Sequence, residues 1–103
     1  MLRTQRNSWI HATATVCVIG LGLWLSLSFI QWAILALTIG LVWMAEFVNT
    51  ALEAVVDLAS PDIHPLARVG KDVGAAAVLV AAITSVIVGL LILGPAVWAK
   101  LFG

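Results

Sequence analysis

Four polar side chains follow one another at helical spacing in the middle of the chain. They are Glu46, Asn49, Glu53 and Asp57, separated by 3, 4 and 4 residues. At about 100° per residue, this spacing places all four within a stripe about 80° wide on one helix. Carboxylates bind Mg²⁺, which in turn holds phosphates, and a carboxylate at the edge of an apolar region suits general-base chemistry. The spacing therefore predicts a helix with one acidic edge that is suited to phosphoryl chemistry.

The other acidic residues lie close by in the sequence. Asp62 and Asp72 complete the five acids of the protein, and all five fall between residues 46 and 72. Lys71 precedes Asp72, and a lysine can stabilise the charge of a phosphoryl group during transfer. Glu46 is the deepest acid, so we expect it to be the general base. The expected metal or nucleotide ligands are Glu53, Asp57 and Asp72, with Lys71 as a phosphate contact.

The segments on both sides of this polar block are apolar enough to cross a membrane. The 103-residue chain is 63% hydrophobic and 10% charged, with a net charge of zero. Residues 8–45 and 73–99 contain no Asp, Glu, Lys or Arg. We therefore expect one all-α membrane domain covering residues 1–103. Nothing in the charge suggests nucleic acid as a partner, and the single Cys17 allows no internal disulfide.

Three spans fit the pattern, at about residues 10–27, 31–59 and 66–93. The residues from Ser26 to Phe29 make a tight turn between the first two. Pro61 ends the second helix, because proline cannot continue the hydrogen-bond ladder and disfavours helical geometry at the preceding residue. Pro65 is tolerated at the start of the third helix, and Gly94-Pro95 is expected to end it. Trp43 lies away from the ends of the apolar runs, so we expect it between helices.

The length of the second helix sets the depth of its acids. About 29 residues span about 43 Å, which exceeds a hydrocarbon thickness of about 30 Å. We expect Glu46 just inside the boundary, Glu53 near the headgroups and Asp57 in water. Four basic residues share this side of the membrane, against Lys100 on the other side, which makes it cytoplasmic by the positive-inside rule. They are Arg3, Arg6, Arg68 and Lys71.

Two segments carry a resemblance to a known family. The run EFVNTALEAVVDL, followed by HPLARVGKDVGAAAVL, closely resembles the motifs of the small bacterial diacylglycerol kinase and undecaprenol kinase family. The pattern E-x-x-N-x-x-x-E-x-x-x-D followed by H-x-x-x-x-x-x-K-D is highly specific, and the resemblance covers nearly the whole chain. It implies a homotrimeric bundle in the bacterial inner membrane, with active sites shared between neighbouring subunits. Such proteins transfer the γ-phosphate of Mg-ATP to a lipid alcohol.

The resemblance also implies roles for single residues. Glu46 matches the proton acceptor, with Asn49 and Lys71 in the catalytic set. Glu53 matches a metal-binding carboxylate, and His11 stands where the diacylglycerol kinases supply a second one. The implied nucleotide-binding residues are Glu53, Asp57, Asp62, His64, Lys71 and Asp72. Arg6, Asn7 and His11 reproduce an R-N-x-x-x-H pattern of undecaprenol kinases, which favours undecaprenol as acceptor. A diacylglycerol kinase that makes phosphatidic acid is the alternative.

Functions of other classes stay open at this point. Carboxylates within a membrane can relay protons or cations, but such a pathway needs polar residues in both halves of the bilayer. Residues 16–42 offer only Ser, Thr and Gln for that purpose. A structural or assembly subunit is the third possibility, and it would not bind ATP. His11 and His64 also have readings without a ligand, and Gly70 and Gly74 favour close helix packing.

Overall fold

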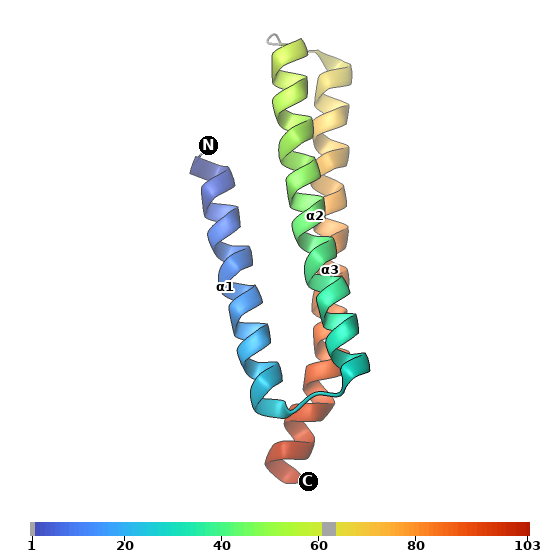
Figure 1. The fold of residues 1–103 in the computed structure, drawn as a ribbon. Coiled ribbons are helices and arrows are strands. Elements are labelled where there is room, and N and C mark those ends of the chain that lie inside the picture. Colours follow the sequence, from blue (N-terminus) through green and yellow to red (C-terminus); the bar gives the residue numbers. More distant parts are fainter. Residues whose placement is uncertain (1, 61–63) are drawn as a thin grey trace.

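The computed structural model describes residues 2–60 and 64–103, with side chains from Ser8 onward. These residues form helix α1 (Leu2–Leu25), helix α2 (Phe29–Ala59) and helix α3 (Pro65–Phe102). Figure 1 shows α2 and α3 lying side by side and antiparallel, with α1 beside them and diverging toward its N-terminus. All three helices are long and apolar enough to cross a membrane. The expectation of an all-α chain with three spans is therefore confirmed.

The turn between α1 and α2 is as tight as the sequence predicted. Ser26 has a positive φ of 55° and ends α1, which stops two residues before the predicted boundary. Ser28 then caps α2, because its hydroxyl accepts from Gln31 N at 3.2 Å. The Gln31 side chain accepts from Ser28 N at 2.9 Å in return, which forms a capping box. This turn fixes α1 and α2 as antiparallel neighbours.

One proline follows the end of α2 in the sequence, and a second proline is the first residue of α3. The second helix ends at Ala59, and Ser60 N still donates to Val56 O at 2.8 Å. The third helix begins at Pro65, as predicted, with His64 as its N-cap. Residues 61–63, including the predicted nucleotide contact Asp62, lie outside the described residues. Both ends of this connector therefore follow the rule that proline ends one helix and opens the next.

The third helix does not end at Gly94-Pro95, so that prediction was wrong. Helix α3 continues through Pro95 to Phe102. Proline inside a helix removes one backbone donor and clashes with the preceding turn. Membrane helices nevertheless tolerate proline, because local adjustment and neighbouring groups satisfy the freed carbonyl. At 38 residues, α3 is about 57 Å long, so it extends well beyond the hydrocarbon layer.

The core of the bundle lies between α2 and α3. The buried residues of α3 are Gly74 and Ala81, and their small side chains let the helix axes approach closely. The buried residues of α2 are Leu35, Val42 and Glu46. Most other large apolar side chains of the described chain face outward, which suits helices surrounded by lipid.

Candidate functional site

The acidic stripe of α2 continues the buried face of that helix. Leu35, Val42 and Glu46 are buried, and they share one direction within about 40° on a helix of 3.6 residues per turn. Glu53 lies in the same direction two turns beyond Glu46. The stripe thus faces the inside of the bundle at its apolar end. Glu46 is only 5% exposed, and a buried carboxylate requires partners inside the protein.

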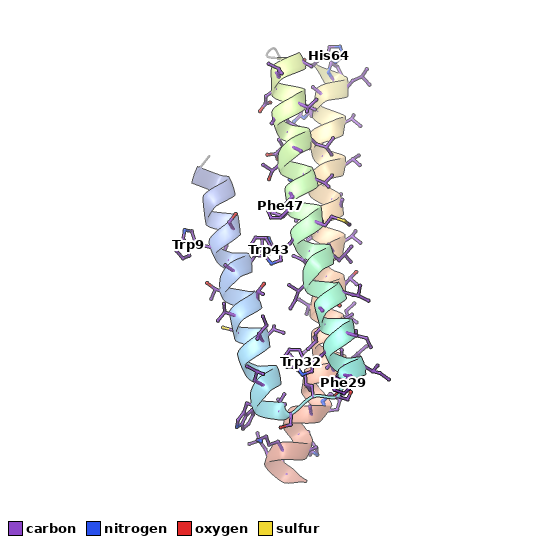
Figure 2. All side chains as sticks on the ribbon, in the orientation of Figure 1. Trp9, Phe29, Trp32, Trp43, Phe47 and His64 are labelled. Carbon is purple, nitrogen blue, oxygen red and sulfur yellow. The ribbon has the colours of Figure 1, made fainter. Side chains whose placement is uncertain are left out.

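One partner of Glu46 comes from α1. His11 Nε2 lies 3.3 Å from Glu46 Oε2, and the His11 side chain is 18% exposed. The imidazole also lies against the ring of Trp43, with 5.8 Å between the ring centroids. The Trp43 ring in turn lies beside the Phe47 ring, with 5.7 Å between their centroids. Figure 2 shows Trp43 and Phe47 between α1 and α2, so the expectation that Trp43 lies between helices is confirmed.

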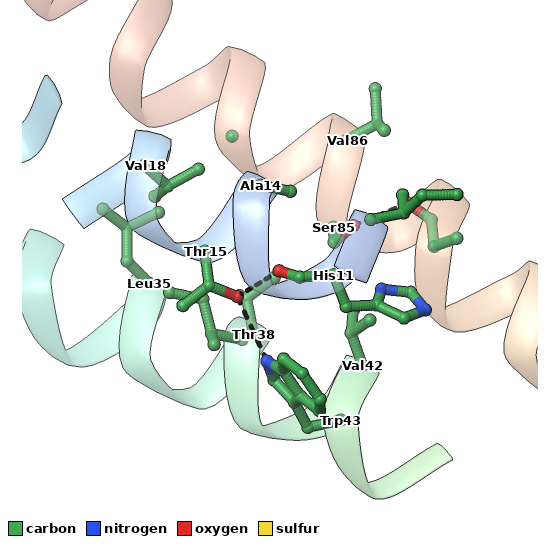
Figure 3. Close-up of a pocket in the computed structure, with 14 residues that line it drawn as sticks. His11, Ala14, Thr15, Val18, Leu35, Thr38, Val42, Trp43, Ser85 and Val86 are labelled. Atoms are coloured by element: carbon green, nitrogen blue, oxygen red, sulfur yellow. Dashed lines mark hydrogen bonds between the residues drawn. The ribbon is translucent and has the colours of Figure 1, made fainter. Parts of the chain in front are cut away.

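A second link between α1 and α2 holds this region together. The Trp43 indole Nε1 donates to Thr15 Oγ1 at 3.1 Å, and the Thr15 hydroxyl donates to His11 O at 2.7 Å. Figure 3 shows these two hydrogen bonds meeting at the Thr15 hydroxyl. The sequence analysis missed Thr15. The available signal was its position one turn after His11, which puts both side chains on the same face of α1.

Asn49 points toward α3 and not toward α1. Its Oδ1 atom is buried without a hydrogen-bond partner among the described residues. A Cβ placed on Gly74 would lie 2.4 Å from that oxygen. The absence of a side chain at Gly74 therefore makes the space that the Asn49 amide occupies. The stripe consequently divides, since Glu46 faces α1 while Asn49 faces α3.

The acids closer to the connector are more exposed. Glu53 is partly buried and lies about 10 Å along the helix axis from Glu46. Asp57 forms an ion pair with Lys71 of α3, and their side chains are 63% and 42% exposed. The structure thus brings Lys71 to the acidic stripe, as the sequence suggested. Asp72 is exposed and lies about 100° around α3 from Lys71, on another face.

His64 has a local structural role. Its Nδ1 accepts a hydrogen bond from Leu66 N at 3.1 Å and so caps α3. The side chain is exposed at the end of the bundle where α2 and α3 meet (Figure 2). A capping role is compatible with the predicted nucleotide contact, because the cap uses only Nδ1 of an exposed side chain.

A cavity of about 310 Å³ opens next to His11, between α1 and the α2–α3 pair. Figure 3 shows its wall, which is mostly aliphatic and includes Val18, Leu35 and Val86. Polar atoms enter it only from a few side chains, namely His11, Thr15, Thr38, Trp43 and Ser85. Such a lining suits a hydrocarbon chain and offers few polar contacts to a charged ligand.

The metal ligands predicted from the resemblance are Glu53 and His11. In residues 2–60 and 64–103, no three His, Cys, Asp or Glu side chains form a group that could hold a metal ion. His11 meets Glu46 and not Glu53. Magnesium, however, is commonly held in kinase sites by one or two carboxylates, with the phosphates of the substrate and water as the other ligands. The partly buried Glu53 fits that requirement, since it lies along α2 between the buried Glu46 and the exposed ion pair of Asp57.

Comparison with known proteins now decides the family. The profile of the prokaryotic diacylglycerol kinase family matches residues 1–93. The chain belongs to this family. Among its relatives is an undecaprenol kinase from Bacillus subtilis, 46% identical over 93 residues, which cover 90% of this chain and 76% of the relative. A diacylglycerol kinase from Synechocystis is 52% identical over 87 residues, which cover 84% of this chain and half of that relative.

The diacylglycerol kinase of Escherichia coli is more distant, at 35% identity over 89 residues, covering 80% of this chain and 73% of the relative. As a member of the prokaryotic diacylglycerol kinase family, the chain is a multi-pass membrane protein and a lipid kinase, which implies ATP as phosphoryl donor. The predictions of family and of enzyme class are confirmed. The family does not favour the alternatives of an ion pathway or a structural subunit.

Proposed function

We propose that this family member transfers the γ-phosphate of ATP to the hydroxyl of a membrane lipid alcohol, with undecaprenol as the favoured acceptor. The observation that carries the proposal is Glu46, a buried carboxylate inside an apolar bundle. It lies about 25 Å along α2 from Phe29, which is within the hydrocarbon thickness but close to its edge. A lipid hydroxyl can reach this depth, whereas ATP stays in water.

The residues divide the reaction between them. The Glu46 carboxylate accepts the proton of the lipid hydroxyl as the hydroxyl oxygen attacks the γ-phosphorus. The bond between the γ-phosphorus and the oxygen bridging to the β-phosphate breaks, and ADP leaves. Lys71 stabilises the charge that develops on the phosphoryl oxygens. Asp57 holds Lys71 toward the stripe through the ion pair, and Asn49 lies between this pair and the base.

Magnesium belongs to the proposal through its carboxylate ligand. Glu53 would hold Mg²⁺ together with the phosphates of ATP, and the ion would neutralise phosphate charge. Asp57, Asp62, His64 and Asp72 are proposed to contact the nucleotide near the connector. His11 was implied as a second metal ligand, but Mg²⁺ prefers oxygen over imidazole nitrogen. Its contact with Glu46 supports a role other than metal binding.

The proposed assembly is a homotrimer in the bacterial inner membrane, with the acidic stripe open to the cytoplasm. Arg68 and Lys71 mark that side by the positive-inside rule. Neighbouring subunits would complete a metal site that the described residues of one chain do not form by themselves. Undecaprenol is favoured over diacylglycerol because of the R-N-x-x-x-H pattern and the relative named undecaprenol kinase.

The proposal is tested by transfer of ³²P from γ-labelled ATP in mixed micelles that contain undecaprenol or diacylglycerol. The wild type should label undecaprenol faster. Glu46→Gln should lower the rate at least 100-fold, because an amide cannot accept the proton, while the size-exclusion profile stays unchanged. Thr84→Val, which also removes a polar group from the membrane region, is the matched control. Full turnover in Glu46→Gln would remove Glu46 from the role of base.

A further inference from the structure

We infer that His11 is a positioning residue for the base: its Nε2–H donates a hydrogen bond to Glu46 Oε2 and fixes the carboxylate in the orientation that accepts the lipid proton. The inference rests on the proposed function. Its geometric basis is the 3.3 Å separation between the two atoms, in a place where Glu46 is 6% and His11 is 18% exposed by side chain. A buried carboxylate that must meet a mobile lipid gains most from a fixed direction.

The imidazole contacts an aromatic ring of α2, and the backbone of His11 is tied to the same residue. The ring of Trp43, on α2, lies against it at a centroid distance of 5.8 Å and a tilt of 57°. The backbone of His11 is tied through Thr15 to the indole of the same Trp43. The hydrogen-bonded path His11–Thr15–Trp43 and the contact His11–Glu46 therefore fasten α1 to α2 one turn apart. Glu46 and Trp43 are three residues apart and share a face of α2, so the imidazole contacts both side chains.

This arrangement favours an orienting role over metal binding. An Nε2 nitrogen that donates its proton to Glu46 has no lone pair for a metal. Magnesium also selects oxygen ligands. A hydrogen bond on Oε2 restricts rotation of the carboxylate and so defines where both of its oxygens lie. Such a contact acts on the rate of proton transfer and not on the binding of either substrate.

Three substitutions at the same position separate these roles. His11→Gln puts an amide donor at about the reach of Nε2, His11→Asn puts one at about the reach of Nδ1, and His11→Phe has no donor. We expect His11→Phe and His11→Asn to lower kcat about 10- to 100-fold, the effect of losing a hydrogen bond to a charged group. His11→Gln should stay within about threefold of the wild type. The KM values for lipid and ATP and the half-maximal Mg²⁺ concentration should not change.

A spectroscopic measurement reports on the contact without turnover. The chain contains two histidines, so a ¹⁵N-histidine NMR spectrum of the protein in micelles is simple, and His64→Asn assigns it. Glu46→Gln should shift the Nε2 resonance of His11, because it replaces the charged acceptor by a neutral one. Glu53→Gln is the matched control on the same stripe, and it should leave that resonance in place.

Three results would overturn the inference. The first is a wild-type kcat in both His11→Phe and His11→Asn. The second is a raised Mg²⁺ requirement in His11→Gln, which would make His11 a metal ligand. The third is a His11 resonance that ignores Glu46→Gln. The proposed function fails separately, by turnover in Glu46→Gln. An inactive Glu46→Gln together with an active His11→Phe would defeat this inference and leave the lipid kinase assignment standing.

Discussion

Gly74→Ala tests how α3 accommodates the polar stripe. The added Cβ would lie 2.4 Å from Asn49 Oδ1, about 1 Å short of ordinary contact. Rotation of the amide about its last bond gives little relief, because Nδ2 then takes the place of Oδ1. The Asn49 side chain must leave its site, or α2 and α3 must separate. Overpacking of this size lowers the free energy of unfolding by about 1–3 kcal/mol. Alanine offsets part of that loss, because its helix propensity is about 1 kcal/mol more favourable than that of glycine.

We therefore expect Gly74→Ala to lower the free energy of unfolding by up to about 2 kcal/mol and to lower kinase activity with it, since Asn49 is displaced. Stability is measured by reversible unfolding of the protein in mixed micelles, and activity by ³²P transfer. Gly70→Ala is the control one turn earlier on α3, where a Cβ meets only Val56 Cγ2, at 3.8 Å. It should be neutral or slightly stabilising.

The double variant Gly74→Ala/Asn49→Ala sharpens the test. If the Cβ acts by striking the amide, truncation of Asn49 should restore most of the stability and none of the activity. The reasoning is refuted if Gly74→Ala matches Gly70→Ala in both stability and activity. It is also refuted if truncation of Asn49 restores nothing, because the damage would then come from elsewhere in the helix pair.

Three further predictions concern contacts outside that pair of residues. His64→Asn should keep α3 capped, while His64→Leu should lose about 1 kcal/mol of stability, measured by unfolding in micelles. Trp43→Phe and Thr15→Val should each cost about 1 kcal/mol and show a coupling of similar size in a double-mutant cycle; additive effects would contradict the hydrogen bond. Asp57→Asn and Lys71→Met break one exposed ion pair and should each change stability by less than about 1 kcal/mol, but only Lys71→Met should abolish ³²P transfer.

The sequence predicted the helices well because the signals were local. Proline at 61 and at 65 defines both sides of the connector through backbone geometry alone. The spacing of the polar residues placed Glu46 on the buried face of α2, and the isolation of Trp43 from the ends of its apolar run placed it between helices. The prediction that Pro95 ends α3 was wrong, because the rule that proline stops a helix holds for soluble proteins and is weaker for membrane helices.

The partners of the site residues could not be predicted from spacing. A helical wheel places Glu46 and Asn49 within about 60° of each other on α2. In the structure, however, Glu46 contacts α1 and Asn49 lies against α3. The pairing of His11 with Glu46 depends on how far α1 extends beside α2, which is set by the three-residue turn and its cap. Only the packed structure brings these distant positions together.

The end of α3 beyond Pro95 has a consequence for how α1 is held. The Lys100 ammonium lies 4.9 Å from the centre of the Trp24 ring. This cation–π contact joins the last turn of α1 to α3, next to the turn that leads to α2. Toward the other end of α1, His11 and Thr15 contact Glu46 and Trp43 of α2. Helix α1 is therefore held at two levels, to α3 near Trp24 and to α2 near His11. A third helix that ended at Gly94-Pro95 would not bring Lys100 to Trp24, so the turns after Pro95 add a second level at which α1 is held.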